Sequence, residues 1–138
     1  MTGSWRVEAS YAEVTVCLVE NDEQVRKQLR ELLTGAGFDV VAAVGTRIEG
    51  EEAITDHRPD VAVIDNCLPD GSGIELCRTL TRATLHVELL LRTETLDSNV
   101  VGEALQAGAA GVILRSIQSE VLLELIRSVH RNNQTGNF

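Results

Sequence analysis

Short apolar runs alternate with longer amphipathic stretches along this chain, after a polar leader at residues 1–12. The run 61–64 is apolar at successive positions, which is typical of a strand buried on both faces, whereas the stretch 22–34 repeats its apolar residues at helical spacing. Gly, Pro and polar residues separate these segments. The pattern predicts strands at 14–19, 38–44, 61–65, 87–91 and 112–114, and helices at 22–34, 49–57, 73–82, 98–107 and 117–131.

The regular alternation of strand and helix indicates an α/β fold. Each short connection forces a right-handed crossover between parallel strands, so the five strands should form one parallel sheet with helices on both faces. A chain of 138 residues suits one domain, which we place at 13–131. The polar segment 132–138 is expected to be a tail or the start of a linker.

Composition narrows the class of function. The chain has 12 Lys and Arg against 21 Asp and Glu, a net charge of -9, and no basic cluster, so we expect no direct binding to nucleic acid. Cys17, Cys67 and Cys77 lie far apart without a C-x-x-C pair, which favours reduced thiols. No long apolar run or signal pattern is present, and a cytoplasmic protein without membrane contact is therefore expected.

Asp65 is the most informative residue for chemistry. It closes a buried strand, and the loop Asn66-Cys67-Leu68-Pro69-Asp70-Gly71-Ser72-Gly73 follows at once. Ligand-binding groups of open α/β sheets lie at this end of the strands, although an Asp before a Pro/Gly loop more often only initiates a turn. The second acidic cluster, Glu20-Asn21-Asp22, ends another buried strand and favours a binding site. Helix capping explains Asp22 but not Glu20.

Several segments resemble the receiver domain of two-component response regulators. The resemblance lies in the run Val19-Glu20-Asn21-Asp22, the segment 65–73, Thr93 and Arg115, and it spans about residues 14–131. It implies a flavodoxin-like (CheY-like) fold with a doubly wound five-stranded parallel sheet and five helices. The segments 68–76 and 104–111 are similar to the branch whose receivers usually precede a LuxR/NarL-type helix-turn-helix output.

The resemblance implies a role for three residues in phosphoryl transfer. Asp65 would be the phosphoacceptor, which attacks the phosphohistidine of a sensor histidine kinase. The hydroxyl of Thr93 would bond the phosphoryl group. Arg115 stands where the family carries a lysine, and its planar guanidinium would pair with the phosphoryl oxygens in a different geometry.

The resemblance also implies a Mg²⁺ site. Its ligands would be Glu20, Asn21, Asp65 and the backbone carbonyl of Cys67. Asn21 stands where the family normally has a second acid, and its amide carries no charge. A unit charge 4 Å from the ion is worth about 4 kcal/mol at an effective dielectric constant near 20, so we expect Mg²⁺ to bind weakly.

Two further positions depart from the family pattern. Val112 replaces the aromatic residue that usually rotates inward on activation. Arg92 occupies a strand position that is normally apolar, and by alternation it shares a face with Glu88. We expect either a salt bridge from Arg92 to Glu88, Glu94 or Asp97, or an altered partner surface.

These features favour a phosphorylatable switch that regulates transcription through an output domain, and not a conventional enzyme. A homodimer is expected through the face of 98–107, 112–114 and 117–131, because the last helix has more apolar positions than one core stripe requires. The alternative is an atypical receiver-like binding module that does not depend on phosphorylation. An unrelated flavodoxin-like enzyme is disfavoured, since no Gly-rich phosphate loop follows the first strand.

Overall fold

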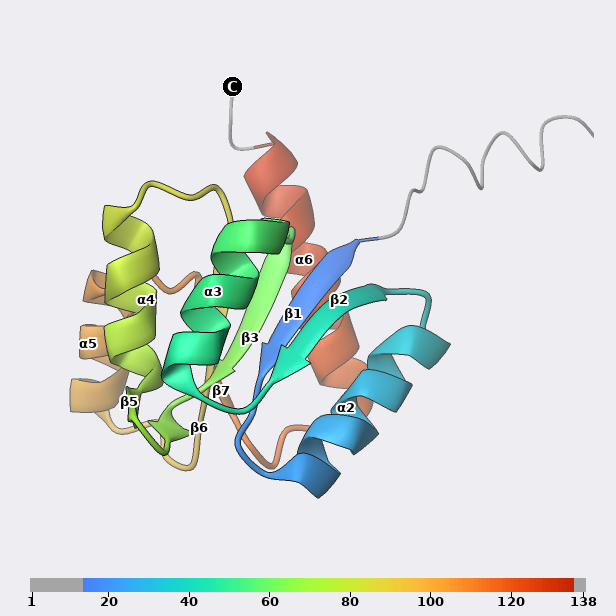
Figure 1. Ribbon diagram of the computed structural model, residues 1–138, viewed down its shortest axis with the longest axis horizontal. Coiled ribbons are helices and arrows are strands. Elements are labelled where there is room, and N and C mark those ends of the chain that lie inside the picture. Colours follow the sequence, from blue (N-terminus) through green and yellow to red (C-terminus); the bar gives the residue numbers. More distant parts are fainter. Residues whose placement is uncertain (1–13, 136–138) are drawn as a thin grey trace, which may run out of the picture.

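The computed structural model describes residues 14–135, so the predicted leader lies outside the described residues. The chain forms β1 (Thr15–Val19), α2 (Glu23–Gly35), β2 (Asp39–Val44), α3 (Arg47–His57), β3 (Val61–Asp65), β4 (Cys67–Leu68), β5 (Gly71–Ser72), α4 (Gly73–Arg82), β6 (Glu88–Thr93), α5 (Ser98–Gln106), β7 (Gly111–Leu114) and α6 (Ser119–Thr135). Figure 1 shows their arrangement.

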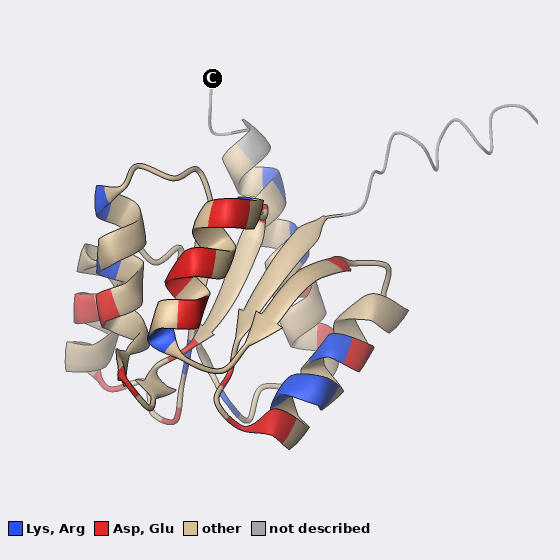
Figure 2. Cartoon of the chain, viewed as in Figure 1, with Lys and Arg blue, Asp and Glu red and all other residues tan. Residues whose placement is uncertain are grey.

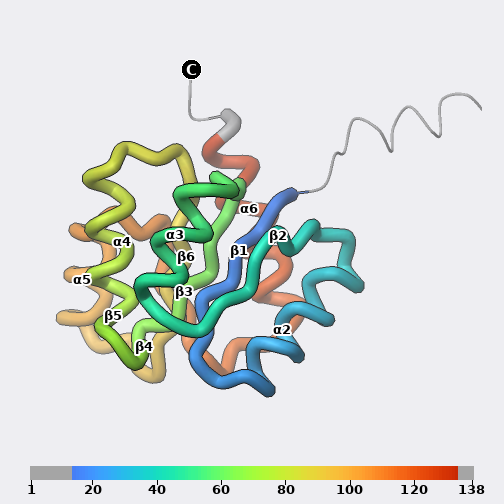
Figure 3. Tube along the Cα trace, in the orientation of Figure 1, coloured from blue at the N-terminus to red at the C-terminus, as the bar shows by residue number. Residues whose placement is uncertain are grey.

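Five of the strands form one parallel sheet in the order β2-β1-β3-β6-β7. The helices α3, α4 and α5 cover one face, and α2 and α6 cover the other, as Figures 1 and 3 show. The predicted α/β fold, with a doubly wound parallel sheet and five helices, is confirmed. Because all five strands run in one direction, their carboxyl ends share one edge of the sheet.

Alternation along each strand divides the core into two clusters. In β3, Ala62 and Ile64 pack under α3, α4 and α5, whereas Val61 and Val63 pack against α2 and α6. All four side chains are at most 2% exposed, which explains why this part of the strand is a continuous apolar run. The same alternation fixes the face on which each residue at the strand end lies.

Most element boundaries lie within two residues of the predicted ones, and three of the differences concern α3, β6 and α6. The helix α3 begins two residues early, because the Thr46 hydroxyl accepts the N–H of Glu49 and caps it. The strand β6 is longer than expected and includes Arg92 and Thr93. The helix α6 continues to Thr135, so it enters the predicted polar tail.

The antiparallel hairpin of β4 and β5 was not predicted. Its strands have two residues each, Cys67–Leu68 and Gly71–Ser72, and only Pro69 and Asp70 separate them. So short a ladder produces no hydrophobic period that a sequence pattern can reveal. The hairpin lies immediately after Asp65 and shapes the loop beside the candidate site.

Candidate functional site

Four charged side chains meet at the carboxyl edge of the sheet, each from a different strand. Glu20 follows β1, Asp65 ends β3, Arg92 lies in β6, and Arg115 follows β7. These strands are consecutive neighbours in the sheet. Side chains two positions apart along a strand lie on the same face of the sheet. Each of the four residues follows by two positions a member of the core cluster under α2 and α6: Leu18, Val63, Leu90 and Ile113. All four therefore lie on the face covered by α2 and α6. Figure 2 shows acidic and basic positions gathered where the strands end, at the bottom of the view.

Arg92 and Glu20 form a buried ion pair. The Nη1 atom of Arg92 donates to Oε1 of Glu20 at 2.6 Å, and the two residues are only 6% and 1% exposed. The other carboxylate oxygen of Glu20 accepts the backbone N–H of Asp22 at 2.9 Å. Both oxygens of Glu20 therefore have short, charge-assisted hydrogen bonds.

This pairing differs from the expectation for Arg92. The sequence suggested Glu88, Glu94 or Asp97 as its partner, because these residues are close to Arg92 along the chain. The structure pairs it instead with Glu20, 72 residues away, across the strand that lies between β1 and β6. The signal that could have found this partner is alternation, which places both side chains on the same face of the sheet.

Asp65 is buried between these charges, with 2% of its surface exposed. Burial raises the pKa of its carboxyl group, and the negative charge of Glu20 raises it further, while Arg115 and then Arg92 oppose this change. Its Oδ1 atom is buried and has no hydrogen-bond partner among residues 14–135. A buried oxygen without a partner is an unusual feature that suits an atom kept for chemistry or for a ligand.

Arg115 connects the two acids. Its Nη2 atom lies 3.6 Å from Oε2 of Glu20 and 3.7 Å from Oδ2 of Asp65, and its Nη1 atom lies 3.6 Å from Oε1 of Glu94. The backbone N–H of Arg115 donates to the carbonyl of Thr93 at 2.9 Å. With 28% of its side chain exposed, Arg115 can reach both the acidic pair and solvent.

The other predicted site residues lie at the same edge but make fewer contacts. Thr93 is buried at the end of β6, and its hydroxyl accepts the N–H of Thr95 at 3.5 Å. Asn21 and Cys67 are exposed. In the part of the chain that the structure describes, no hydrogen bond or ion pair joins the side chain of Thr93 or Asn21 to Asp65. The structure thus joins Glu20, Asp65 and Arg115, as expected of neighbouring strand ends, and adds Arg92.

The loop after Asp65 approaches the backbone of that residue closely. A Cβ atom on Gly73 would lie 2.5 Å from the carbonyl oxygen of Asp65 and 2.7 Å from a methyl carbon of Leu91, so only glycine fits here. The N–H of Gly73 donates to the carbonyl of Asn66 at 3.0 Å. Helix α4 therefore begins directly against the strand that carries Asp65.

The side chains in this arrangement fit a Mg²⁺ ion poorly. Within residues 14–135, no group of three or more His, Cys, Asp or Glu residues is placed to hold a metal. Glu20 is engaged with Arg92, and Asn21 brings no charge. The two carboxylates and two guanidinium groups at the strand ends carry no net charge between them, and Glu94, the further partner of Arg115, is exposed to water. Mg²⁺ instead favours an excess of anionic oxygen. The Mg²⁺ site at Glu20, Asn21, Asp65 and the carbonyl of Cys67 stays a prediction.

Comparison with known proteins identifies the family. Residues 16–127 match the model of the response regulator receiver domain, which is most of the chain, so the chain belongs to this family. It is a signal-transduction domain of two-component systems, as the resemblance implied.

The matched relatives and structures agree with the family and the fold. The DNA-binding transcriptional activator DevR/DosR of Mycobacterium tuberculosis is 38% identical over 118 residues, which cover 84% of this chain and 54% of that protein. A LuxR-family two-component response regulator from Aurantimonas sp. SI85-9A1 superposes with a TM-score of 0.82 at 26% identity, covering 87% of this chain and 86% of the other.

A third match is the CheX-CheY complex with BeF3 and Mg²⁺ from Borrelia burgdorferi. It has a TM-score of 0.78 at 20% identity and covers 83% of this chain and 87% of the other, which shows a shared fold. The chain spans about half the length of its curated relatives. Among the described residues, no helix is long and apolar enough to cross a membrane.

Proposed function

We propose that this receiver accepts a phosphoryl group on Asp65 from the phosphohistidine of a sensor histidine kinase. The observation that carries this proposal is the state of the Asp65 carboxylate. One of its oxygens is buried without a partner, and the other lies 3.7 Å from the guanidinium of Arg115. A nucleophilic oxygen beside a fixed positive charge is the arrangement that phosphoryl transfer requires.

In the proposed step, an oxygen of Asp65 attacks phosphorus while the bond between phosphorus and the kinase histidine breaks. The product is an acyl phosphate on Asp65, and the histidine nitrogen leaves with its electron pair. Arg115, which lies 3.7 Å from Asp65, would stabilise charge on the transferred oxygens, and Thr93, at the end of the neighbouring strand, would bond one of them. These residues supply position and charge, which is most of what this reaction needs from a protein.

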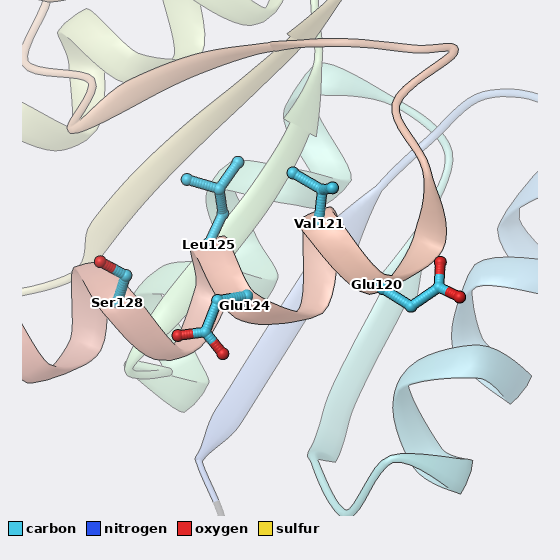
Figure 4. A pocket seen from close by; sticks show the side chains of 5 residues that line it. All are labelled: Glu120, Val121, Glu124, Leu125 and Ser128. Atoms are coloured by element: carbon cyan, nitrogen blue, oxygen red, sulfur yellow. The ribbon is translucent and has the colours of Figure 1, made fainter.

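The phosphorylated domain would pass its signal through the surface of α5, β7 and α6. Leu105 of α5 and Val121 of α6 are 52% and 44% exposed, although they are apolar. Val121 and Leu125 line a shallow pocket with Glu120, Glu124 and Ser128, and Figure 4 shows these side chains along one side of α6. Exposed apolar groups with a polar rim favour a protein partner, and we assign this surface to a homodimer.

Regulation of transcription in the cytoplasm is the proposed outcome. The support comes from the relatives, since DevR/DosR is a DNA-binding transcriptional activator and this chain matches about half of its length. The acidic receiver itself has a net charge of -9 and is a poor surface for DNA. An output domain would therefore contact DNA, and the receiver would act as a signalling module rather than an enzyme.

One observation favours a second candidate function. The ion pair of Arg92 and Glu20 neutralises the acid that receivers offer to a metal, and Asn21 removes another charge. A receiver altered in this way could serve as a binding module that does not depend on phosphorylation. The two candidates differ in a single measurable property, which is whether Asp65 becomes phosphorylated.

Intact-protein mass spectrometry after incubation with acetyl phosphate tests the proposal. The parent should gain the mass of one phosphoryl group, and Asp65→Asn should not. Asp56→Asn, which changes an exposed acid on α3, is the matched control and should behave as the parent. An adduct that persists in Asp65→Asn contradicts the assignment, and the absence of an adduct in every protein, with and without Mg²⁺, supports the binding module.

A further inference from the structure

We infer that the guanidinium of Arg92 takes the place of the divalent cation in this site, so that the site is complete without Mg²⁺. Arg92 is then a positioning residue and a permanent counter-charge for Glu20. The inference concerns the same site as the proposed function. It rests on that function only where phosphoryl transfer is measured.

The first argument is geometric. A metal ion at this edge would need an oxygen of Glu20, but Oε1 accepts from Arg92 at 2.6 Å and Oε2 accepts from the N–H of Asp22 at 2.9 Å. Arg115 also faces Oε2 at 3.6 Å. A metal could reach Glu20 only by displacing a short, buried ion pair, and breaking such a pair leaves an uncompensated buried charge.

The second argument is electrostatic. Glu20 and Asp65 are opposed by Arg92 and Arg115, so the four groups balance before any ion arrives. A divalent cation would add two positive charges beside two guanidinium groups. Coulomb repulsion at these distances is strong where water is scarce, so the balanced site should reject Mg²⁺.

The third argument concerns unused hydrogen-bonding atoms. In the described residues, the buried Nε of Arg92 and the buried Oδ1 of Asp65 both have no hydrogen-bond partner. Asp65 and Arg92 are paired in register on neighbouring strands. A free nucleophilic oxygen beside a free donor suits a phosphoryl group, which would form an acyl phosphate with Asp65 and accept a hydrogen bond from Arg92.

The local sequence explains why Arg92 can occupy this place. Leu89 and Leu91 belong to one core cluster and Leu90 to the other. Arg92 follows Leu90 by two positions, so its side chain lies on the face of Glu20 and Asp65. An arginine has the length to cross the width of β3 and a planar head that stays charged at any relevant pH. A shorter apolar residue here would leave Glu20 buried without a counter-charge.

A Mg²⁺ titration of the full 138-residue chain tests the inference. Thermal unfolding is followed by circular dichroism over a series of MgCl₂ concentrations at constant ionic strength, for the parent, Arg92→Gln and the control Arg82→Gln, which changes an exposed arginine of α4. We expect no saturable rise in unfolding temperature for the parent or the control. Arg92→Gln should unfold at a lower temperature than the parent without metal, and Mg²⁺ should restore part of this loss. We expect the variant to bind Mg²⁺ at least about tenfold more tightly than the parent does.

Arg92→Lys keeps the charge and is expected to remain insensitive to Mg²⁺, which separates the effect of charge from that of shape. If Arg92→Gln does not fold, the double variant Glu20→Gln with Arg92→Gln, which removes both charges, takes its place. The titration of the parent still decides whether the native site binds Mg²⁺. Saturable binding of Mg²⁺ by the parent at or below about 1 mM, unchanged by Arg92→Gln, overturns the inference.

Phosphorylation by acetyl phosphate in EDTA gives an independent test. An adduct on Asp65 of the parent in EDTA, at a yield close to that with Mg²⁺, supports the inference. An adduct that forms only with Mg²⁺ overturns it. If no adduct forms under either condition, the proposed function fails, and the titration alone decides whether Arg92 replaces the cation.

Discussion

The carboxylate of Asp70 accepts hydrogen bonds from the backbone N–H of Arg47 at 2.6 Å and that of Ile48 at 3.0 Å. These donors lie in the first turn of α3, where N–H groups have no partner within the helix. Asp70 thus fastens the hairpin of β4 and β5 to a helix more than twenty residues earlier in the chain. The bond from Arg47, more than any other cause, holds the pKa of Asp70 below its ordinary value.

Replacing Asp70 should weaken the fold in a pH-dependent way. A carboxyl group whose pKa is lower in the folded protein stabilises it above the unfolded pKa, and this stabilisation disappears as the pH falls through the folded pKa. We expect Asp70→Ala to lower the unfolding temperature at pH 7 by a few degrees and to have a smaller effect at pH 2. Thermal unfolding at both pH values checks this, with Asp56→Ala as the control. Equal losses at both pH values would show that the charge is unimportant.

Asp65→Asn should stabilise the domain. The pKa of Asp65 is raised by burial and then by Glu20, so the folded protein binds this proton more tightly than the unfolded chain does, and stability is lost as the pH rises through the folded pKa. A neutral Asn avoids this loss. We expect the unfolding temperature of Asp65→Asn to exceed that of the parent by about 2–6 °C at pH 7, with the difference shrinking below about pH 4. A lower unfolding temperature at pH 7 contradicts this account of the site.

The three cysteines should react very differently. Burial raises the pKa of both Cys17 and Cys77 to about 12, whereas Cys67 is exposed two residues after Asp65. Because the thiolate is the nucleophile, iodoacetamide at pH 8 should modify Cys67 in the native protein, at least about tenfold faster than the other two. Peptide mass spectrometry locates the label. Rapid modification of Cys17 or Cys77 would mean that the core opens more readily than its burial indicates.

The labelling rate of Cys67 also gives a readout for Arg115. If Arg115 pairs with the phosphoryl group, a beryllofluoride mimic should slow the modification of Cys67 in the parent, and Arg115→Ala should raise the concentration required by about tenfold. Arg115→Lys should recover part of the loss, because it keeps the charge without the fork. Arg82→Ala, which removes an exposed arginine at the end of α4, is the control. Equal responses of all variants would make Arg115 a surface charge only.

Val121 provides a test of the proposed dimer surface. Sedimentation velocity over a concentration series should show self-association of the parent even without phosphate. Val121→Glu should weaken it about tenfold, because the change places a charge among apolar groups of the interface. Ile48→Glu, which alters an equally exposed apolar residue on α3, should have no effect. A strict monomer at every concentration removes the dimer hypothesis.

Sequence patterns were sufficient for most of the fold and for part of the site. Apolar runs located the strands, and the shared carboxyl edge brought Glu20, Asp65 and Arg115 together, as the distances from Arg115 confirm. The partner of Arg92 was missed because only neighbours along the chain were considered, whereas parallel sheets bring together residues that are distant in sequence. The roles of Thr93, Asn21 and the carbonyl of Cys67 stay predictions, since a role toward a ligand depends on contacts that the chain alone does not make.

The close contact of Gly73 with the carbonyl of Asp65 belongs to a tightly held loop, and the two sides of the proposed phosphoacceptor differ in how firmly they are held. On one side, the N–H of Asn66 donates to the carbonyl of Arg92 in β6, the N–H of Gly73 donates to the carbonyl of Asn66, and Asp70 accepts from the first turn of α3. On the other side, the segment 94–97 after β6 is exposed and held mainly by its own Thr95 and Asp97. A displacement that starts at Asp65 should therefore move the segment 94–97 more easily than the loop 66–73. The segment 94–97 leads into α5, and we expect the proposed signal to travel in that direction rather than toward α4.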